Sequence, residues 1–176
     1  LMPAQIADII IKSNKVVCIA IDGDFSHKRD TDLIGIYNIY GPNEGIYTTD
    51  EDGFFSLARS YSYGITSKQF AEVMVSIRLK SDRVSPCRNR NLIAVNNGIF
   101  DYESKQLLPF TPDKVFLSKS KVDYNPNAVN PVITEPDGSL WDVESWMGEL
   151  SDDPEVVNLL WCIIGAIIRP NVPWYK

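Results

Sequence analysis

The segment from Asn91 to Pro112 constrains the fold most strongly, because it combines strand-forming residues with a kink and two prolines. Residues 92–95 are an apolar run of the kind that forms a buried strand. Asn97 and Gly98 follow, and both residue types tolerate the backbone that a turn or bulge requires. β-prone residues then resume, and residues 103–105 are a polar tip before the chain returns. Pro109 and Pro112 cannot donate to a sheet ladder and end the unit. The sequence therefore predicts a strand, a kink and a tight hairpin.

Hydrophobic spacing predicts helices and short strands along the rest of the chain. Helices are expected at Pro3–Ser13, Phe54–Tyr63, after the N-cap Thr66, at Leu140–Leu150 and after Asp153–Pro154. Strands are expected at Lys15–Ile21, Leu33–Tyr40, Ile46–Thr48 and Lys114–Tyr124, and irregular loops at residues 22–32 and 125–138. This pattern predicts an α+β fold with helices packed around a small, mainly antiparallel sheet. We expect a single domain over residues 1–176, with residues 1–90 and 91–176 as its substructure.

The formal net charge of −6 is unevenly distributed. Residues 77–121 contain nine basic and four acidic side chains, whereas residues 122–176 contain two basic and nine acidic ones. A basic middle between acidic ends can bind a polyanion or pair internally. The three cysteines are far apart and fit neither a disulfide framework nor a zinc pattern, which favours a reducing compartment. The N-terminus lacks the features of a signal peptide.

The basic stretch is the candidate site for DNA contact. Phosphate binding needs cationic side chains along one groove, and single-stranded DNA also uses aromatic stacking. The candidate residues are Arg78, Lys80, Arg83, Arg88 and Arg90, of which the last three are predicted to lie in a loop. A solvated loop is the alternative interpretation. The helix pair at residues 54–80 is expected to serve packing, with a helix-turn-helix DNA reader as the alternative.

Catalytic chemistry has few candidates. No glycine is followed by lysine, so the chain has no P-loop and we expect no ATP hydrolysis by it. A single histidine, His27, leaves no basis for a histidine-rich metal site. Asp22 and Asp24 follow a predicted strand and could hold magnesium for nucleotidyl transfer, with Asp30 or Asp32 completing the site. All of these carboxylates lie in one polar loop, which favours a solvated turn and no metal site.

The helix after Asp153–Pro154 is apolar on most faces from Val156 to Ile168. A thirteen-residue helix is about 20 Å long, which is too short to span a bilayer. A helix that is apolar all round is normally buried. We therefore expect it to pack in this core or against a neighbouring domain, and Arg169–Pro170 to end it.

The residues from Asn91 to Pro112 resemble the signature block of the phage and plasmid primase–helicase family, in the domain that precedes the superfamily 3 helicase ATPase. The features shared are an apolar run, an Asn-Gly pair, an Asp, a polar tip and two prolines, here at Asn97, Gly98, Asp101, Pro109 and Pro112. Gly45-Ile46-Tyr47 resembles the end of a tyrosine-rich hairpin of that domain. A Trp-containing helix before a long apolar helix, at residues 141–165, resembles its C-terminal part.

The resemblance implies a non-catalytic accessory domain of a phage or mobile-element replication protein. The whole protein would unwind DNA as a ring, with a hexamer expected, using ATP and magnesium in an ATPase outside this chain. The domain would position that ring through its last helix, contact DNA as a further partner and act in the cytoplasm of a bacterial host. Two alternatives stay open: a magnesium-dependent primase using Asp22 and Asp24, and an adaptor that binds only protein.

Overall fold

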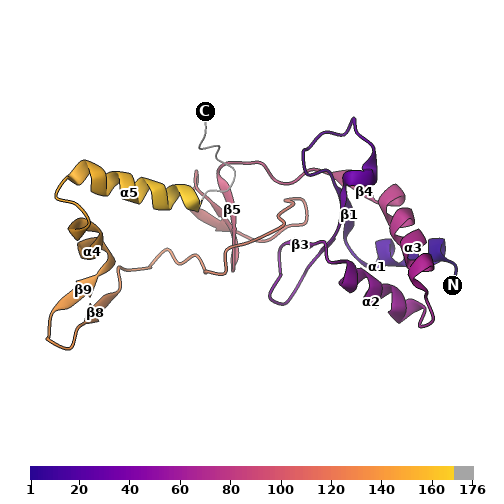
Figure 1. The fold of residues 1–176 in the computed structure, drawn as a ribbon, viewed down its shortest axis with the longest axis horizontal. Coiled ribbons are helices and arrows are strands. Elements are labelled where there is room, and N and C mark those ends of the chain that lie inside the picture. Colours follow the sequence, from indigo (N-terminus) through magenta and orange to yellow (C-terminus); the bar gives the residue numbers. More distant parts are fainter. Residues whose placement is uncertain (169–176) are drawn as a thin grey trace.

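Three small sheets succeed one another along the chain in a computed structural model that describes residues 1–168. Figure 1 shows helices α1 to α3 beside the first sheet, the second sheet near the middle, and the third sheet with α4 at the far end. Helix α5 returns from that end toward the second sheet. The predicted α+β class is confirmed, but the strands form three sheets where the sequence suggested one.

The first sheet has the order β3-β2-β1-β4 and is antiparallel except for one pair. Its strands are β1 (Val16–Ile19), β2 (Leu33–Tyr37), β3 (Tyr47–Thr48) and β4 (Asp82–Val84), and the 3-10 turn η1 (Arg29–Thr31) precedes β2. β4 runs parallel to β1, with Cys18 opposite Arg83. The chain between β1 and β4 includes two helices, which follow β3. A long connection of this kind is what a parallel pair of strands requires.

The main core lies between this sheet and helices α1 (Pro3–Ser13), α2 (Glu51–Tyr61) and α3 (Ser67–Lys80). The predicted spacing is confirmed, since each helix buries one stripe of apolar side chains: Ile6, Ile10, Phe54, Ala58, Val73 and Ile77. The predicted cap of α3 is also confirmed, because Thr66 Oγ1 accepts from the backbone N–H of Gln69. Packing thus accounts for the helix pair.

The predicted hairpin unit forms the second sheet, in the order β5-β6-β7. β5 (Leu92–Val95), β6 (Gly98–Asp101) and β7 (Gln106–Leu108) are antiparallel. One face packs Leu92, Ala94 and Ile99 against Ile46 and Phe116. The first two sheets therefore share a core through the β2–β3 hairpin.

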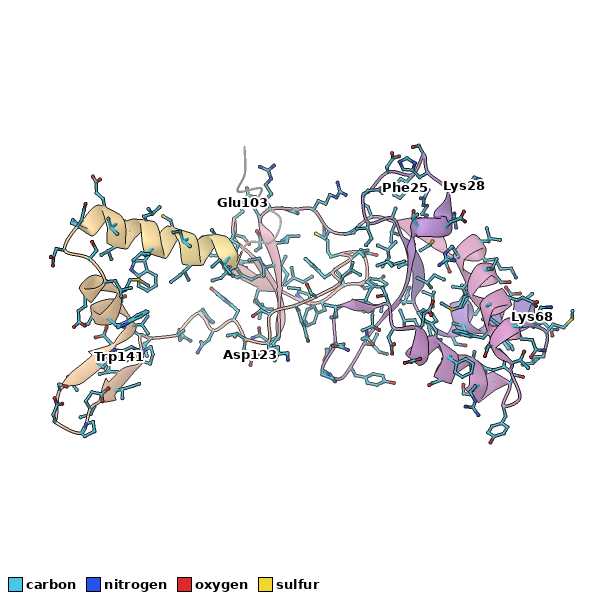
Figure 2. The ribbon with its side chains drawn as sticks, in the orientation of Figure 1. Phe25, Lys28, Lys68, Glu103, Asp123 and Trp141 are labelled. Carbon is cyan, nitrogen blue, oxygen red and sulfur yellow. The ribbon has the colours of Figure 1, made fainter. Side chains whose placement is uncertain are left out.

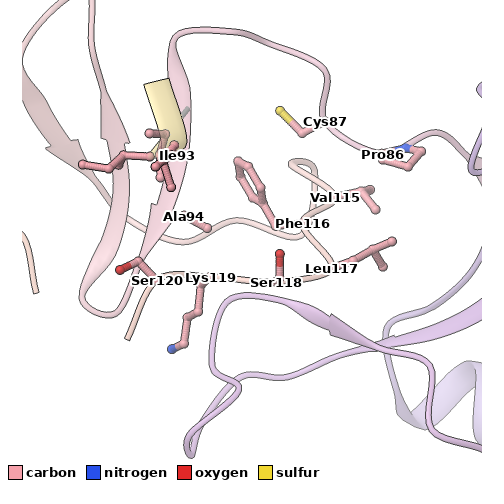
Figure 3. A pocket seen from close by; sticks show the side chains of 12 residues that line it. Pro86, Cys87, Ile93, Ala94, Val115, Phe116, Leu117, Ser118, Lys119 and Ser120 are labelled. Atoms are coloured by element: carbon pink, nitrogen blue, oxygen red, sulfur yellow. The ribbon is translucent and has the colours of Figure 1, made fainter. Parts of the chain in front are cut away.

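Residues 114–124, predicted as a strand, instead bridge the first two sheets. Phe116 O accepts from Tyr47 N at 2.8 Å, whereas Ser120 N donates to Ala94 O at 2.9 Å. The backbone of this segment is thus divided between two sheets, so no continuous ladder forms. Figure 3 shows Lys119 extending toward the β2–β3 hairpin, where its Nζ lies 2.9 Å from Glu44 O.

The C-terminal part departs from prediction in two further places. β8 (Val132–Thr134) lies in the predicted loop and pairs with β9 (Leu140–Asp142), which replaces the first turn of the predicted helix. α4 (Val143–Glu149) follows with Asp142 as its N-cap, whose Oδ1 accepts from Ser145 N at 2.8 Å. α5 (Pro154–Ile167) has the predicted Asp153 cap. The expected stop at Arg169–Pro170 lies outside the described residues.

Candidate functional site

Arg83 is the centre of a polar cluster beneath the loop formed by residues 21–32. It lies in β4 and not in a loop, so that part of the prediction is wrong. Arg83 Nε and Nη2 donate to Asp32 Oδ2 and Oδ1 at 2.6 and 2.9 Å. Its Nη1 donates to the carbonyls of Phe25 and His27 at 2.8 and 3.0 Å. Four of the five N–H donors of the guanidinium therefore have internal acceptors.

Asp32 is a buried carboxylate that this cluster keeps ionised. Its exposed fraction is 4%, and the hydrogen bonds from Arg83 lower its pKa from the usual value of 3.8. Cys18 Sγ donates to Asp32 Oδ2 at 3.4 Å. Burial, and then this hydrogen bond, raise the pKa of the Cys18 thiol to about 11. The cluster therefore holds an ion pair beside a protonated thiol.

Other members of the basic stretch also make internal contacts. Arg88 Nη2 donates to Ile21 O at 3.0 Å, and Lys80 Nζ lies 2.6 Å from Asp8 Oδ1. Arg78 is half-buried with an Nε that has no hydrogen-bond partner among the described residues, whereas Arg90 is exposed. The structure thus disperses the five residues over β4, α3 and the connection to β5, and DNA contact by them stays a prediction.

The acidic loop does not gather its carboxylates into one site. Asp22 Oδ1 accepts from Asp24 N, and Asp24 Oδ1 accepts from Ser26 N, at 2.9 and 2.8 Å. Figure 2 shows Phe25 and Lys28 on this exposed loop near β4. Asp32, one of the two candidates for a third ligand beside Asp30, is already ion-paired with Arg83. Within residues 1–168, no group of three metal-ligating side chains converges. The geometry therefore gives no support to the magnesium-dependent alternative.

The signature residues have structural roles in the second sheet. A Cβ on Gly98 would lie 2.6 Å from the carbonyl oxygen of Leu108, so only glycine fits there without a shift of backbone. Asp101 Oδ1 and Oδ2 accept from Glu103 N and Ser104 Oγ, both at 2.9 Å, and fix the β6–β7 turn. Pro112 O accepts from the buried Tyr47 hydroxyl at 2.9 Å. Pro109 follows β7 directly, which agrees with the predicted end of the strand.

The family model described as D5 N terminal like matches residues 57–151. This match covers more than half of the chain. The chain belongs to the D5 N-terminal-like family. Such domains form the N-terminal region of phage and viral primase–helicase proteins, so the resemblance drawn from residues 91–112 is confirmed. No curated protein matches the chain.

In this D5 N-terminal-like chain, α5 lies beyond the matched residues and none of its side chains is buried. Exposed fractions of 58% for Leu159, 47% for Ile163 and 78% for Ile167 mark a stripe at i, i+4 and i+8. Of the two expected packing sites, the core of this chain is therefore excluded for α5 within residues 1–168, and packing against a neighbouring domain stays a prediction. Among residues 1–168, no helix is long and apolar enough to cross a membrane.

Sequence reasoning missed a second apolar surface, on the side of the β5–β6–β7 sheet that faces away from the shared core. This outer face carries Ile93, Val95, Phe100, Tyr102 and Leu107. Phe100 stacks on Tyr124 with ring centroids 4.4 Å apart. A mainly apolar cavity of about 470 Å³ opens beside these rings and is also bordered by Ile168. The alternation that places Phe100 and Tyr102 on one side of the strand could have indicated this face from the sequence. Tyr124 reaches the same face only through the tertiary fold.

Proposed function

We propose that this D5 N-terminal-like region is a non-catalytic accessory domain of a phage or mobile-element DNA primase–helicase. Its role is to position the helicase ATPase in the assembled protein. ATP and magnesium belong to that ATPase module, since the present sequence contains no P-loop. The proposal extends to a hexameric parent that acts in the cytoplasm of a bacterial host.

The observation that carries this proposal is the apolar surface that α5 leaves exposed within residues 1–168. Val156, Leu159, Ile163 and Ile164 are each at least 40% exposed, although apolar area of this kind gains about 25 cal/mol per Å² when removed from water. Contiguous apolar surface on a folded protein marks an interaction site. α5 is therefore the element through which the domain contacts the rest of the assembly.

The acidic side chains near the first sheet make structural contacts. The buried carboxylate Asp32 is used in an ion pair, and the neighbouring acidic side chains hold local turns. The polar groups that sequence reasoning considered for chemistry stabilise a loop on the first sheet.

The test is binding between this chain and the ATPase module encoded by the parent gene, measured by isothermal titration calorimetry. Wild-type chain is expected to bind, and the exposed-face variant Leu159→Asp/Ile163→Asp to bind at least tenfold more weakly, because two charges would enter an apolar interface. Lys12→Asp/Lys68→Asp alters helices of the first core and serves as the control. A parent gene without an ATPase module, or equal binding by wild type and the α5 variant, contradicts the proposal.

Direct DNA contact is a second proposal, favoured by the exposure of Arg88 and Arg90 on the connection between the first two sheets. Fluorescence anisotropy with a labelled oligothymidine tests it. Salt-sensitive binding that weakens in Arg88→Ala/Arg90→Ala is expected, because phosphate contacts release counterions. Flat titrations at low salt would favour an adaptor that binds only protein.

A further inference from the structure

We propose that α5 of one copy of this chain packs on the outer face of the β5–β6–β7 sheet of a second copy. The inference rests on the docking role that the proposed function gives to α5. It makes the outer face of a neighbouring copy the surface that receives the helix, so that the ATPase module is positioned by copies that are linked in this way. The occupant of the outer face is thus a second copy of the same chain.

α5 lies near the β5–β6–β7 sheet of its own chain only at its C-terminal end. Ile167 and Ile168 border cavities that Ile93 also lines. Figure 1 shows the rest of α5 running away from β5 toward α4, at the end of an arm that starts with an extended segment. A 14-residue helix is about 21 Å long, so most of its apolar stripe lies beyond the sheet of its own chain.

The outer face has the shape and chemistry to receive an apolar helix. Leu107 is 37% exposed and Val122, at the rim, is 71% exposed. Between the strands and residues 120–124, the cavity of about 470 Å³ offers space for side chains such as Leu159 or Ile163. The Phe100 ring already stacks on Tyr124 and meets the Tyr102 ring edge-on, so the aliphatic side chains around it supply much of the surface for an apolar helix.

Charge distribution indicates that the partner is another copy. Residues 122–168 contain nine acidic side chains and no lysine or arginine, whereas residues 77–121 contain nine basic and four acidic ones. Glu149 and Asp152 lie just before α5, and the exposed Lys105 and Lys121 lie next to the outer face. Lys105 Nζ is held 5.2 Å from the centroid of the Tyr102 ring. An acidic arm with an apolar helix therefore complements a basic rim around an apolar face.

The two surfaces are different patches of one chain, and this fixes the kind of contact that they make. When a patch on one copy meets another patch on the next copy, the arrangement is head-to-tail, and it closes into a ring if the rotation allows. The accessory domains would then link neighbouring subunits of the primase–helicase directly.

Sedimentation equilibrium of the purified chain between 1 and about 200 µM tests the inference, because specific interfaces of ordinary size give dissociation constants of about micromolar or tighter. Wild type is expected to associate. Leu159→Asp/Ile163→Asp on the helix and Leu107→Asp/Val122→Asp on the outer face are each expected to remain monomeric. All four positions are exposed, so far-UV circular dichroism should show an unchanged fold.

A charge exchange tests the pairing of the two surfaces. Lys105→Glu/Lys121→Glu and Glu149→Lys/Asp152→Lys are each expected to weaken association about tenfold, since each places like charges opposite one another across the interface. The chain with all four substitutions should recover wild-type association. Lys12→Glu/Lys68→Glu makes the same change in net charge as the first pair, on α1 and α3, and should have no effect.

Three outcomes overturn the inference. They are a wild-type chain that stays monomeric up to the highest concentration, association that survives Leu107→Asp/Val122→Asp, and a fourfold variant without recovery. A monomeric chain that still binds the ATPase module rejects this inference and leaves the proposed function intact. Self-association without binding to that module supports this inference and rejects the proposed function.

Discussion

The side-chain amide of Asn97 holds the backbone of Tyr124 through two hydrogen bonds. Asn97 Nδ2 donates to Tyr124 O, and Asn97 Oδ1 accepts from Tyr124 N, both at 2.9 Å. The amide thereby acts as a strand neighbour would, and it brings residues 120–124 along the edge of β5. The ring of Tyr124 is placed on Phe100 by the same contact. The Asn of the signature pair is thus a clamp for the outer face of the second sheet.

Replacement of Asn97 by alanine should destabilise the chain by about 1–2 kcal/mol, because two hydrogen bonds of ordinary strength are lost at a partly solvated site. Urea unfolding followed by tyrosine fluorescence measures this change. Asn127→Ala, in the exposed loop that follows, is the matched control and should alter the free energy of unfolding by less than about 0.5 kcal/mol. Equal stability of the two variants would show that the clamp contributes nothing.

Gly98→Ala should destabilise the chain by about 1–3 kcal/mol, the usual cost of forcing an extra methyl group into a packed site. Its Cβ would meet the carbonyl oxygen of Leu108 at 2.6 Å, and a backbone atom cannot move aside as a flexible side chain can. Gly165→Ala, in α5 where the added Cβ meets no other part of residues 1–168 within 4 Å beyond the helix's own backbone, should instead be neutral or stabilising. Thermal unfolding of both variants distinguishes steric conflict from a general effect of removing glycine.

Local patterns predicted the elements that depend on neighbouring residues. The α1 range, the capping box of Thr66 and the Asp153 cap are confirmed, because caps and apolar stripes are properties of a few successive residues. Residues 114–124 failed because their backbone groups bond to two different sheets, which no local alternation reveals. The packing site of α5 stayed undecided between this core and a neighbouring domain for a related reason, since a pattern shows that a helix needs a partner and not where the partner is.

The candidate site shows the same limit of local information. Sequence reasoning grouped Arg78, Lys80, Arg83, Arg88 and Arg90 by proximity along the chain. The parallel pairing of β4 with β1 instead brings Arg83 against Asp32, which is 51 residues away. Asp32, from the predicted polar loop, is thus the partner of Arg83, which the sequence suggested for DNA binding. Such pairings depend on the order of strands, which the sequence left undetermined.

The Asp32–Arg83 pair predicts a loss of stability at low pH. Because the pKa of Asp32 is lowered in the folded state, its contribution is complete above about pH 4 and is lost as the pH falls through the folded-state pKa. Asp32→Asn should cost about 3 kcal/mol at pH 7, since it leaves Arg83 without its charged partner, and should make stability less dependent on pH below 4. Asp30→Asn, at an exposed position in η1, should retain the wild-type pH dependence. Urea midpoints between pH 2 and 7 measure both, and parallel curves for wild type and Asp32→Asn would contradict the prediction.

The cysteines should differ sharply in their reaction with iodoacetamide. Cys18 is fully buried and its pKa is raised to about 11, whereas Cys162 is exposed on α5. The thiolate is the reactive form, so a rise from 9.0 to about 11 alone lowers its fraction at pH 8 about a hundredfold. Mass spectrometry of peptides after timed alkylation should show Cys162 modified first and Cys18 only when urea unfolds the chain. Because the folded-state pKa is raised, the contribution of Cys18 to stability is complete below pH 9 and falls as the pH approaches 11. Alkylation of Cys18 in the folded chain at a rate comparable to that of Cys162 would show that the loop over the Arg83 cluster opens freely.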